Sequence, residues 1–185
     1  MQHKIVFVAF AICVSILSFG KTLGAEEAKD WFQEGNRLAR EGRFDSAVEA
    51  YQRSLKLNPG ATVVYYNLGL AHKKMKQYEQ AVTALEKAVE MEPDYLEAHL
   101  ALGNCYNLME RWESAIAHLN LVVHQIPDDA EAHGNLGWAL YNYKVDPPFK
   151  MLVVINLRKA VRLFEAQGFT QAAEATRGIL DSALA

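Results

Sequence analysis

Four asparagines are the residues whose type and spacing best suit a chemical role in this chain. Asn36 and Asn67 are 31 residues apart, and Asn104 and Asn135 repeat that spacing. A carboxamide offers both hydrogen-bond donors and an acceptor, so it can pair with the backbone of an extended polypeptide of any sequence. The spacing therefore favours recognition of a peptide over bond-breaking chemistry. The alternative is that these asparagines only bridge neighbouring structural units.

Side chains that could catalyse a reaction or bind a metal ion are few and unfavourably spaced. Cys105 has no Cys-His-Asn set around it and is expected to be a small buried hydrophobe. His99 and His133 are 34 residues apart, in a slot that earlier units fill with aromatic rings, so we interpret them as structural. His118 and His124 are six residues apart and do not share a helix face. The chain also lacks a Gly-rich phosphate loop and a His-Glu-x-x-His motif, so we expect no catalytic residue, no metal site and no cofactor.

The charged clusters have simple structural interpretations. The basic segment 72–76 lies at the expected end of a helix, where cations favour the helix dipole; contact with an acidic partner is the alternative. Asp94 precedes Glu97 by three residues, and Asp128 precedes Glu131 by three, which matches an acidic N-cap with a reciprocal glutamate. We therefore expect these glutamates to cap helices rather than to act as paired carboxylates.

A period of 34 residues indicates which elements position these side chains. Gly accounts for only 11 and Pro for only 5 of the 185 residues, so coincidence does not explain their repeated registration. Four sets of residues follow the period: Gly35, Gly69, Gly103 and Gly137; Pro59, Pro93 and Pro127; Ala47, Ala81 and Ala115; and Phe44, Tyr78 and Trp112. A period of this length indicates stacked units of two helices each.

Each unit is expected to contain a helix, a tight turn and a second helix. In the second unit the apolar spacing predicts helices over 62–75 and 78–91, with the turn at 76–77. A glycine inside a helix costs about 0.5–1 kcal/mol relative to alanine, so its recurrence needs a reason. We expect Gly69 to allow close approach of the two helices, with Ala81 as its small counterpart.

Four units and a closing helix are expected within residues 26–185. Their expected bounds are 28–61, 62–95, 96–129 and 130–167, followed by a helix over 169–184. The fourth unit carries an insertion near 144–149, between its two helices. The last helix is amphipathic and is expected to cap the exposed end of the array.

This pattern resembles the tetratricopeptide repeat (TPR) family. In the second unit the residues that carry the resemblance are Tyr65, Leu68-Gly69, Ala81, Leu85, Ala88 and Pro93. The match extends over about 28–163. The resemblance implies an all-α, right-handed α-solenoid of antiparallel helix pairs that functions in protein interaction and is not an enzyme. Glu34 and Ser54 depart from the pattern; because they lie in the terminal unit, we expect them to be tolerated on a face without a neighbour.

The resemblance assigns binding to the concave face formed by the first helices of the units. The exposed inner residues are expected to be Phe32, Asn36, Tyr66, Asn67, Leu70, Asn104, Asn107, Asn135, Trp138, Tyr141 and Asn142. The asparagines would meet a peptide backbone, and the aromatic rings would supply apolar contact. Family members that grip a terminal carboxylate need Lys or Arg where this chain has Phe32, Glu97 and Ala101, so that specialised function is not expected.

Residues 1–25 resemble a secretory signal peptide or an uncleaved N-terminal membrane anchor. A short basic start precedes the apolar run 5–19, and small residues at 24–25 precede two glutamates. The run is short for a membrane-spanning helix. Export places residues 26–185 outside the cytoplasm, where Cys105 alone cannot form an intrachain disulfide.

Charge and composition narrow the partners and the compartment. Two of the 19 basic residues lie in the leader, so residues 26–185 carry 17 basic and 22 acidic side chains, a net charge of −5, which argues against nucleic acid. The nine Asn include no Asn-x-Ser/Thr sequon, which favours a bacterial cell-envelope protein. We therefore expect an exported or membrane-tethered TPR adaptor, periplasmic or anchored to the inner membrane facing the periplasm, that binds protein segments in its concave groove. The alternative is a permanent structural subunit of a larger membrane complex of the cell envelope.

Overall fold

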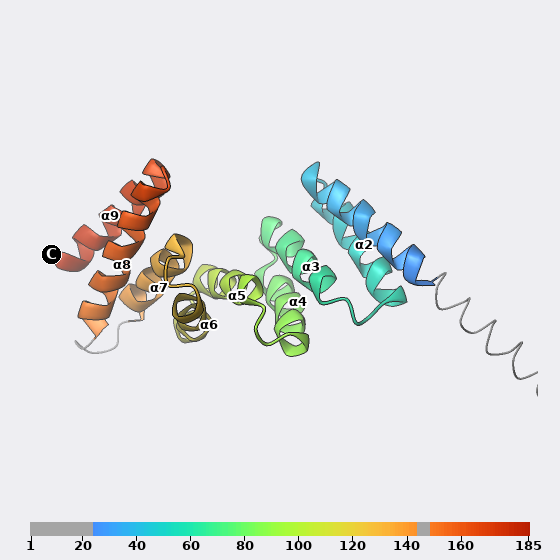
Figure 1. Cartoon of the computed structure of the whole chain (residues 1–185), viewed down its shortest axis with the longest axis horizontal. Helices are drawn as coiled ribbons and strands as arrows, with labels where there is room; N and C mark the ends of the chain where they lie inside the picture. Colours follow the sequence, from blue (N-terminus) through green and yellow to red (C-terminus); the bar gives the residue numbers. More distant parts are fainter. Residues whose placement is uncertain (1–23, 144–148) are drawn as a thin grey trace, which may run out of the picture.

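The computed structural model describes residues 24–143 and 149–185, and within these ranges the chain is helical and contains no strand. A first helix spans residues 24–40, followed by α2 (Phe44–Leu57), α3 (Thr62–Lys74), α4 (Tyr78–Met91), α5 (Leu96–Leu108), α6 (Trp112–Gln125), α7 (Ala130–Asn142), α8 (Phe149–Ala166) and α9 (Thr170–Leu184). The helices follow one another along the long axis of the molecule as successive pairs (Figure 1). The expected all-α solenoid of helix pairs is confirmed.

Short turns join the two helices of a unit, and their backbone explains where the helices end. Gly42 has φ 76°, Lys76 has φ 61° and Glu110 has φ 57°. A residue in this left-handed conformation cannot continue an α-helix. In the second unit α3 ends one residue earlier than expected, at Lys74, and α4 has the expected bounds, Tyr78–Met91.

The recurring glycines let the two helices of a unit approach closely. A Cβ atom added at Gly69 would lie 2.6 Å from Cγ of Leu85 and 3.1 Å from the Ala81 carbonyl oxygen. At Gly103 the added atom would lie 2.5 Å from Cγ of Leu119. Both carbon separations are far below the favourable 3.5–4.0 Å or so. The close approach is confirmed, but its main partner is a leucine side chain of the second helix rather than the small side chain of Ala81.

The apolar core between the helices consists of two clusters, one centred on the first helix, α2 and α3 and the other extending from α4 to α9. Its largest buried residues come from α2 and from α4 to α8: Tyr51, Leu85, Leu102, Leu119, Leu136 and Leu157. Each helix packs mainly on the helices next to it along the chain, and α5 also contacts α7. Because each unit buries its apolar face only against its neighbours, stability depends on the interfaces between successive units.

The start of α5 differs from the expected acidic cap. Tyr95, not Asp94, is the residue before the helix, and its side chain makes no capping hydrogen bond to the described chain. The turn continues one residue further than expected, because the Tyr95 N–H donates to the Glu92 carbonyl oxygen at 3.1 Å. The predicted capping pair of Asp94 with Glu97 is therefore wrong.

The cap of α7 is acidic but lies one residue later than predicted. Asp129 accepts a hydrogen bond from the Ala132 backbone N–H at 2.7 Å, whereas Asp128 forms an ion pair with Lys159 of α8 at 2.9 Å. The same extra turn residue as before α5 causes the displacement. Glu131 is not part of this cap as predicted, because its carboxylate bonds to a side chain of α5 described below.

Ser54 is buried rather than tolerated on an open face. Its side chain is 2% exposed, and its hydroxyl donates to the Ala28 carbonyl oxygen of the first helix at 2.7 Å. A buried hydroxyl is unfavourable unless it is hydrogen-bonded. Ser54 therefore ties the first helix to α2. The expectation that Ser54 is tolerated because it lies on a face without a neighbour is wrong.

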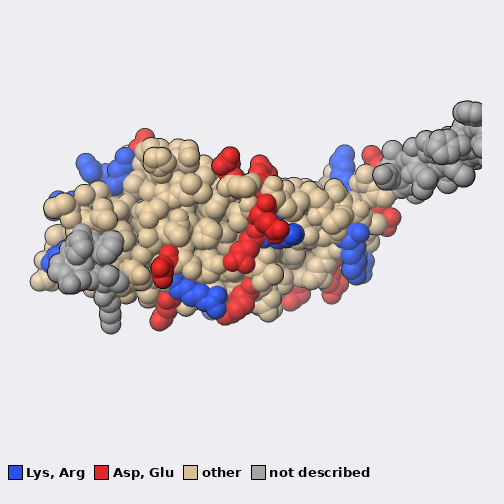
Figure 2. Space-filling model, turned by 90° about the horizontal axis from the view of Figure 1, so that it is seen from below, with Lys and Arg blue, Asp and Glu red and all other residues tan. Residues whose placement is uncertain are grey.

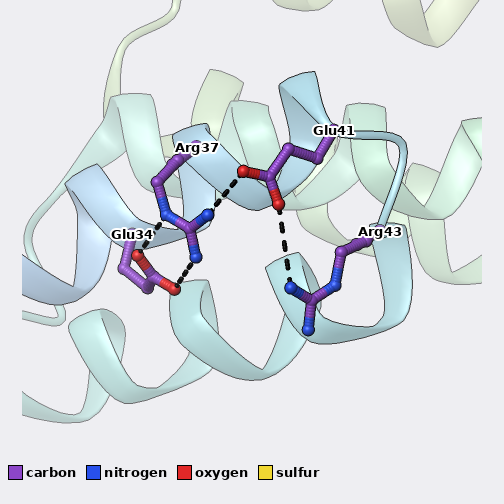
Figure 3. A network of polar contacts seen from close by, with 4 residues as sticks. All are labelled: Glu34, Arg37, Glu41 and Arg43. Carbon is purple, nitrogen blue, oxygen red and sulfur yellow. Dashed lines mark hydrogen bonds and ion pairs between the residues drawn. The ribbon is translucent and has the colours of Figure 1, made fainter.

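Glu34, the other departure in the first unit, belongs to a charge network on the surface (Figure 3). The Arg37 guanidinium bonds both Glu34 oxygens, at 2.8 and 2.6 Å, and also contacts Glu41, which faces Arg43 at 3.7 Å. The hydrogen bond from Arg37 lowers the pKa of Glu34. Exposed pairs of this kind contribute little to stability.

On the face seen in Figure 2, the acidic and basic side chains also lie in small groups, with uncharged surface between one group and the next.

Helix α9 covers the C-terminal end of the array. It packs on α8 and α7 and buries Ala173, Thr176, Leu180 and Ala183. The predicted insertion near 144–149 and the apolar run 5–19 lie outside the described residues, apart from the start of α8. Among the helices that the structure describes, none is long and apolar enough to cross a membrane.

Candidate functional site

Two cavities open on the inner face, which we define as the face formed by the first helix (24–40), α3, α5 and α7. The first cavity, of about 680 Å³, is lined by Gln33, Asn36, Ala39, Arg40, Phe44, Tyr51, Asn67, Leu70, Ala71 and Lys74. The second cavity, of about 360 Å³, is lined by Lys73, Asn104, Asn107, Leu108, Glu131, Asn135 and Trp138. Seven of the predicted groove residues line one cavity or the other.

The first cavity combines apolar surface with two cations. Phe44 and Leu70 supply apolar lining, whereas Arg40 and Lys74 are exposed and form no ion pair with the described residues. No carboxylate is among the described residues that line this cavity. A cavity lined by charges of one sign favours a ligand of the opposite sign. The first cavity is thus suited to an anionic group attached to an apolar one.

The predicted pair Asn36 and Asn67 meets at this cavity, but the two side chains bond to each other. Asn67 Nδ2 donates to Asn36 Oδ1 at 2.9 Å, and the Tyr51 hydroxyl donates to the same oxygen at 2.9 Å. Burial raises the pKa of Tyr51, which keeps this hydroxyl protonated. The contact is the bridge between units that the sequence allowed as the alternative; contact with a peptide stays a prediction.

The second pair repeats this bridge between the third and fourth units. Asn135 Nδ2 donates to Asn104 Oδ1 at 2.5 Å, and Asn104 Nδ2 donates to Glu131 Oε1 at 2.7 Å. Asn107 forms a further link, because its Nδ2 donates to the Asn135 backbone carbonyl oxygen at 3.0 Å. These bonds join α5 to α7 and so fix the position of two walls of the second cavity.

Of the remaining predicted groove residues, Trp138 lines the second cavity, whereas Phe32, Tyr66, Tyr141 and Asn142 line neither cavity. Trp138 and Tyr141 stack with ring centroids 6.2 Å apart, and they are 36% and 39% exposed. Tyr66 instead packs on Tyr95 at 5.0 Å and lines neither cavity. Burial raises the pKa of both tyrosines, to about 12 for Tyr95. Asn142 lines neither cavity either, and its Nδ2 donates to the Trp138 carbonyl oxygen at 2.8 Å.

The sequence prediction missed the charged residues of the inner face. Arg40, Lys74 and Leu108 each stand five residues after the recurring glycine of their unit, the position that Asn142 holds in the fourth unit. Lys73 stands four residues after Gly69, just as the predicted groove residue Asn107 stands four residues after Gly103. The 34-residue period therefore indicates that these residues lie on the inner face. Interpreting the lysines of segment 72–76 only as the solvated end of a helix overlooks this indication.

His99 and His118 form a hydrogen-bonded pair that sequence spacing did not predict. Their Nδ1 atoms are 2.8 Å apart, and Nε2 of His99 lies 3.0 Å from the Pro93 carbonyl oxygen. Because a carbonyl only accepts, His99 carries its proton on Nε2, and His118 Nδ1–H donates to His99 Nδ1. Tyr106 stacks on His118 with centroids 5.6 Å apart and donates to Glu86 at 2.7 Å. The pair is part of the packing between helices.

The free energy of unfolding is expected to decrease as the pH falls from about 7 to about 5 because of this pair. Burial, and then the neighbouring His99, lowers the pKa of His118 below its ordinary value of 6.5, against a smaller opposing effect of Glu86. When the pH falls below about 6.5, His118 binds a proton more readily in the unfolded chain than in the folded protein, and this difference favours unfolding. His118→Gln should flatten this dependence in urea titrations followed by circular dichroism. His124→Gln, an exposed change on the same helix, should not; equal slopes for the two variants would contradict the assignment.

Cys105 lies inside the core, as expected of a small hydrophobe. Its side chain is completely buried, and burial raises the pKa of the thiol, which makes the reactive thiolate scarce. Within residues 24–143 and 149–185, no group of three or more His, Cys, Asp or Glu side chains is placed to hold a metal ion.

Two family models match the repeated units. A model described as Tetratricopeptide repeat matches residues 73–137, and one described as TPR repeat matches residues 35–76. Together they span 35–137, more than half of the 185 residues. The chain belongs to the TPR family. Almost all residues that line the two cavities of this TPR protein lie in the matched range. Among curated proteins, none matches the sequence.

Solved TPR structures share this fold over most of the chain. A crystal structure of MamA protein has a TM-score of 0.71 at 22% identity, covering 86% of this chain and 87% of MamA. MamA (41 to end) from Desulfovibrio magneticus RS-1 has a TM-score of 0.69 at 19% identity, covering 85% and 93%. The first TPR domain of Spaghetti (RPAP3), bound to the HSP90 peptide SRMEEVD, has a TM-score of 0.60 at 22% identity, covering 62% and 91%. At these identities the likeness establishes the fold alone.

Proposed function

We propose that this TPR protein is a non-catalytic adaptor whose inner face binds an extended segment of a partner protein. The observation that carries the proposal is the first cavity, where Arg40 and Lys74 stand beside the apolar surface of Phe44 and Leu70. A segment that offers an acidic side chain next to an apolar one satisfies both features. The partner segment is accordingly acidic at this point.

The carboxamides of the first cavity support contact with a polypeptide backbone. The bond between Asn36 and Asn67 uses one amide hydrogen and one carbonyl oxygen. The Asn36 amide nitrogen and the Asn67 side-chain oxygen make no hydrogen bond to the described residues, so each can still pair with a peptide group. RPAP3 TPR domains of the same fold are seen with HSP90 and HSP70 peptides. Because Phe32, Glu97 and Ala101 replace the cations of a terminal-carboxylate clamp, we place an internal segment here rather than a chain end.

We also propose that the adaptor works in the bacterial cell envelope. The apolar run 5–19 after a basic start supports export, with residues 26–185 in the periplasm, either released or tethered to the inner membrane. A mature part without an intrachain disulfide is compatible with that compartment because the stacked units supply their own core. The leader lies outside the described residues, so its sequence alone supports this part of the proposal.

Exchanging the charges of the first cavity tests the function. Arg40→Glu combined with Lys74→Glu should weaken partner binding at least about tenfold, because each charged contact contributes about 1.5–3 kcal/mol. The matched control, Lys29→Glu with Lys56→Glu, makes the same change in net charge at exposed positions outside the cavity. Crosslinking of the full chain in native cell-envelope fractions, followed by mass spectrometry, provides the readout. If both double variants retain the partner equally, the inner face is not its binding site.

The same cells also allow a test of whether residues 1–25 direct export and whether they are cleaved. The intact mass of the natural protein separates cleavage after Ala25 from an uncleaved anchor, and protease accessibility in spheroplasts reports on which side of the membrane residues 26–185 lie. A full-length protein that fractionates with the cytoplasm would refute the proposed compartment and leave the binding proposal standing.

An exposed apolar patch on α8 favours a second candidate, a permanent subunit of a larger membrane complex. Met151, Leu152 and Ile155 are 71%, 44% and 53% exposed and stand on adjacent turns of the helix. Contiguous exposed apolar side chains of this kind often mark a lasting interface. Co-purification at a fixed stoichiometry that survives charge exchange at Arg40 and Lys74 would favour this candidate over the adaptor.

A further inference from the structure

Asn107 carries an enclosed acceptor that lacks a donor. The residue is 8% exposed, and its Nδ2 donates to the Asn135 backbone carbonyl oxygen at 3.0 Å. Because that partner is itself an acceptor, the amide cannot be turned over, and Oδ1 must face the other way. Among the buried side-chain nitrogen and oxygen atoms of the described residues, Asn107 Oδ1 is the one without a hydrogen-bond partner. Such an atom in a folded protein needs an explanation.

The surroundings of Asn107 are those of a binding cavity. It lines the second cavity, where the other two carboxamides, Asn104 and Asn135, are already bonded to each other. One cation, Lys73, and one carboxylate, Glu131, share the lining, so their charges offset. The second cavity thus favours a neutral ligand, in contrast to the first cavity, where both charged residues are cations.

Apolar surface adjoins this acceptor. Leu108 is 54% exposed and Trp138 is 36% exposed, and both line the cavity. The Trp138 ring is held in place by Tyr141, which stacks on it, and by Trp112, which meets it edge-on at 6.5 Å between centroids. A fixed, partly exposed indole provides apolar contact at small cost in conformational entropy.

We infer that the second cavity is a subsite for a neutral residue of the bound segment, with its backbone N–H donating to Asn107 Oδ1 and its apolar side chain packing on Trp138 and Leu108. The inference rests on the proposed function, because it assigns one position of the same segment. A backbone N–H is the donor that every non-proline residue of an extended segment supplies. Since Asn107 Oδ1 is closed to solvent, the lining side chains must shift slightly on binding, and the exposed side chain of Leu108 has room to do so.

The two cavities together define a recognition pattern for one segment. The part that lies at Arg40 and Lys74 is acidic, and the part that lies at Asn107 and Trp138 is neutral and apolar. Proline is excluded at the residue that meets Asn107, because proline lacks the N–H donor.

Selected peptides with methylated backbone nitrogens test this subsite. A phage-displayed library of random dodecapeptides is selected on the full chain, and the tightest peptide is resynthesised with a fluorescent label for anisotropy measurements. N-methylation of one residue of this peptide should weaken binding to the unmodified protein about fivefold or more, since it removes one hydrogen bond. Against Asn107→Leu, which lacks the acceptor, the same methylation should change affinity less than about twofold.

A second pair of changes keeps the test informative if Asn107→Leu is too unstable to measure. Replacing the apolar residue of the peptide at this position by alanine should weaken binding to the unmodified protein roughly tenfold. Trp138→Ala removes the partly exposed ring on which that residue packs, so the same change in the peptide should then weaken binding much less. Absence of coupling at both Asn107 and Trp138, with binding still lost on charge exchange at Arg40 and Lys74, overturns the subsite and leaves the proposed function standing. A library that yields no peptide sensitive to Arg40 and Lys74 overturns both.

Discussion

Replacing Gly69 by leucine is expected to lower the free energy of unfolding by about 3 kcal/mol, at the upper end of the usual effect of overpacking. Even the first added carbon would lie 2.6 Å from Cγ of Leu85 and 3.1 Å from the Ala81 carbonyl oxygen. Leu85 is completely buried, so it cannot withdraw into solvent, and the helices must move apart. Urea unfolding followed by circular dichroism at the helix band measures the loss.

The chain contains a matched control for this substitution. Gly178 lies in α9, and apart from its chain neighbours and the nearby backbone of its own helix, no atom of the described residues lies within 4 Å of an added Cβ. Gly178→Leu should therefore be neutral or raise stability by up to about 1 kcal/mol, through the helix propensity that glycine lacks. In a Leu85→Ala background, Gly69→Ala should lose most of its own penalty, because the clashing side chain is absent. Equal losses at positions 69 and 178 would show that close packing is not the reason for the recurring glycines.

Removing residues 169–185 is expected to lower the free energy of unfolding by at least about 3 kcal/mol and to promote aggregation. Leu180 and Ala183 of α9 belong to the core cluster that includes Val153 and Leu157 of α8. Without α9 the apolar surface of α8 faces water, as it does in any solenoid that loses its terminal cap. Thermal unfolding and size-exclusion chromatography of the truncated chain provide the measurement.

Single substitutions in α9 separate the loss of packing from the loss of chain length. Leu180 is 8% exposed, and Leu180→Ala should destabilise by about 2 kcal/mol or more. Leu184 is 47% exposed on the same helix, and Leu184→Ala should change stability by less than about 0.5 kcal/mol. A truncated chain as stable and monomeric as the full one would show that α9 does not serve as a cap.

The fold could be predicted from the sequence because one constraint is repeated along it. Each unit must bury an apolar face against copies of itself, so the residues that meet at helix contacts, such as Gly69 and Leu85, recur at the period of the packing. Local preference alone was a weaker guide. Asp94 is a good N-cap residue, yet the turn after Pro93 carries the chain one residue further and leaves Tyr95 before the helix.

The inner-face position of the candidate site could also be predicted in large part from the period. Asn36 and Asn67 lie on the inner face that the period predicts for them, since residues that share a repeat position share a face of the array. Arg40 and Lys74 follow the same rule, and an interpretation of each position by its place in the repeat would have found them.

The hydrogen-bond partners, in contrast, were decided by the tertiary structure alone. The 31-residue offset of Asn36 and Asn67 is compatible with a bond between them or with a bond from each to a ligand, and helix separation and side-chain rotamers select the first. His99 and His118 meet only because α5 packs on α6 at a particular rotation about the helix axes. Helix separation and side-chain rotamers also decide that Asn107 Oδ1 has no donor among the described residues. Spacing along a chain specifies which residues face one another, but the distances and directions between their atoms are set only when the helices pack.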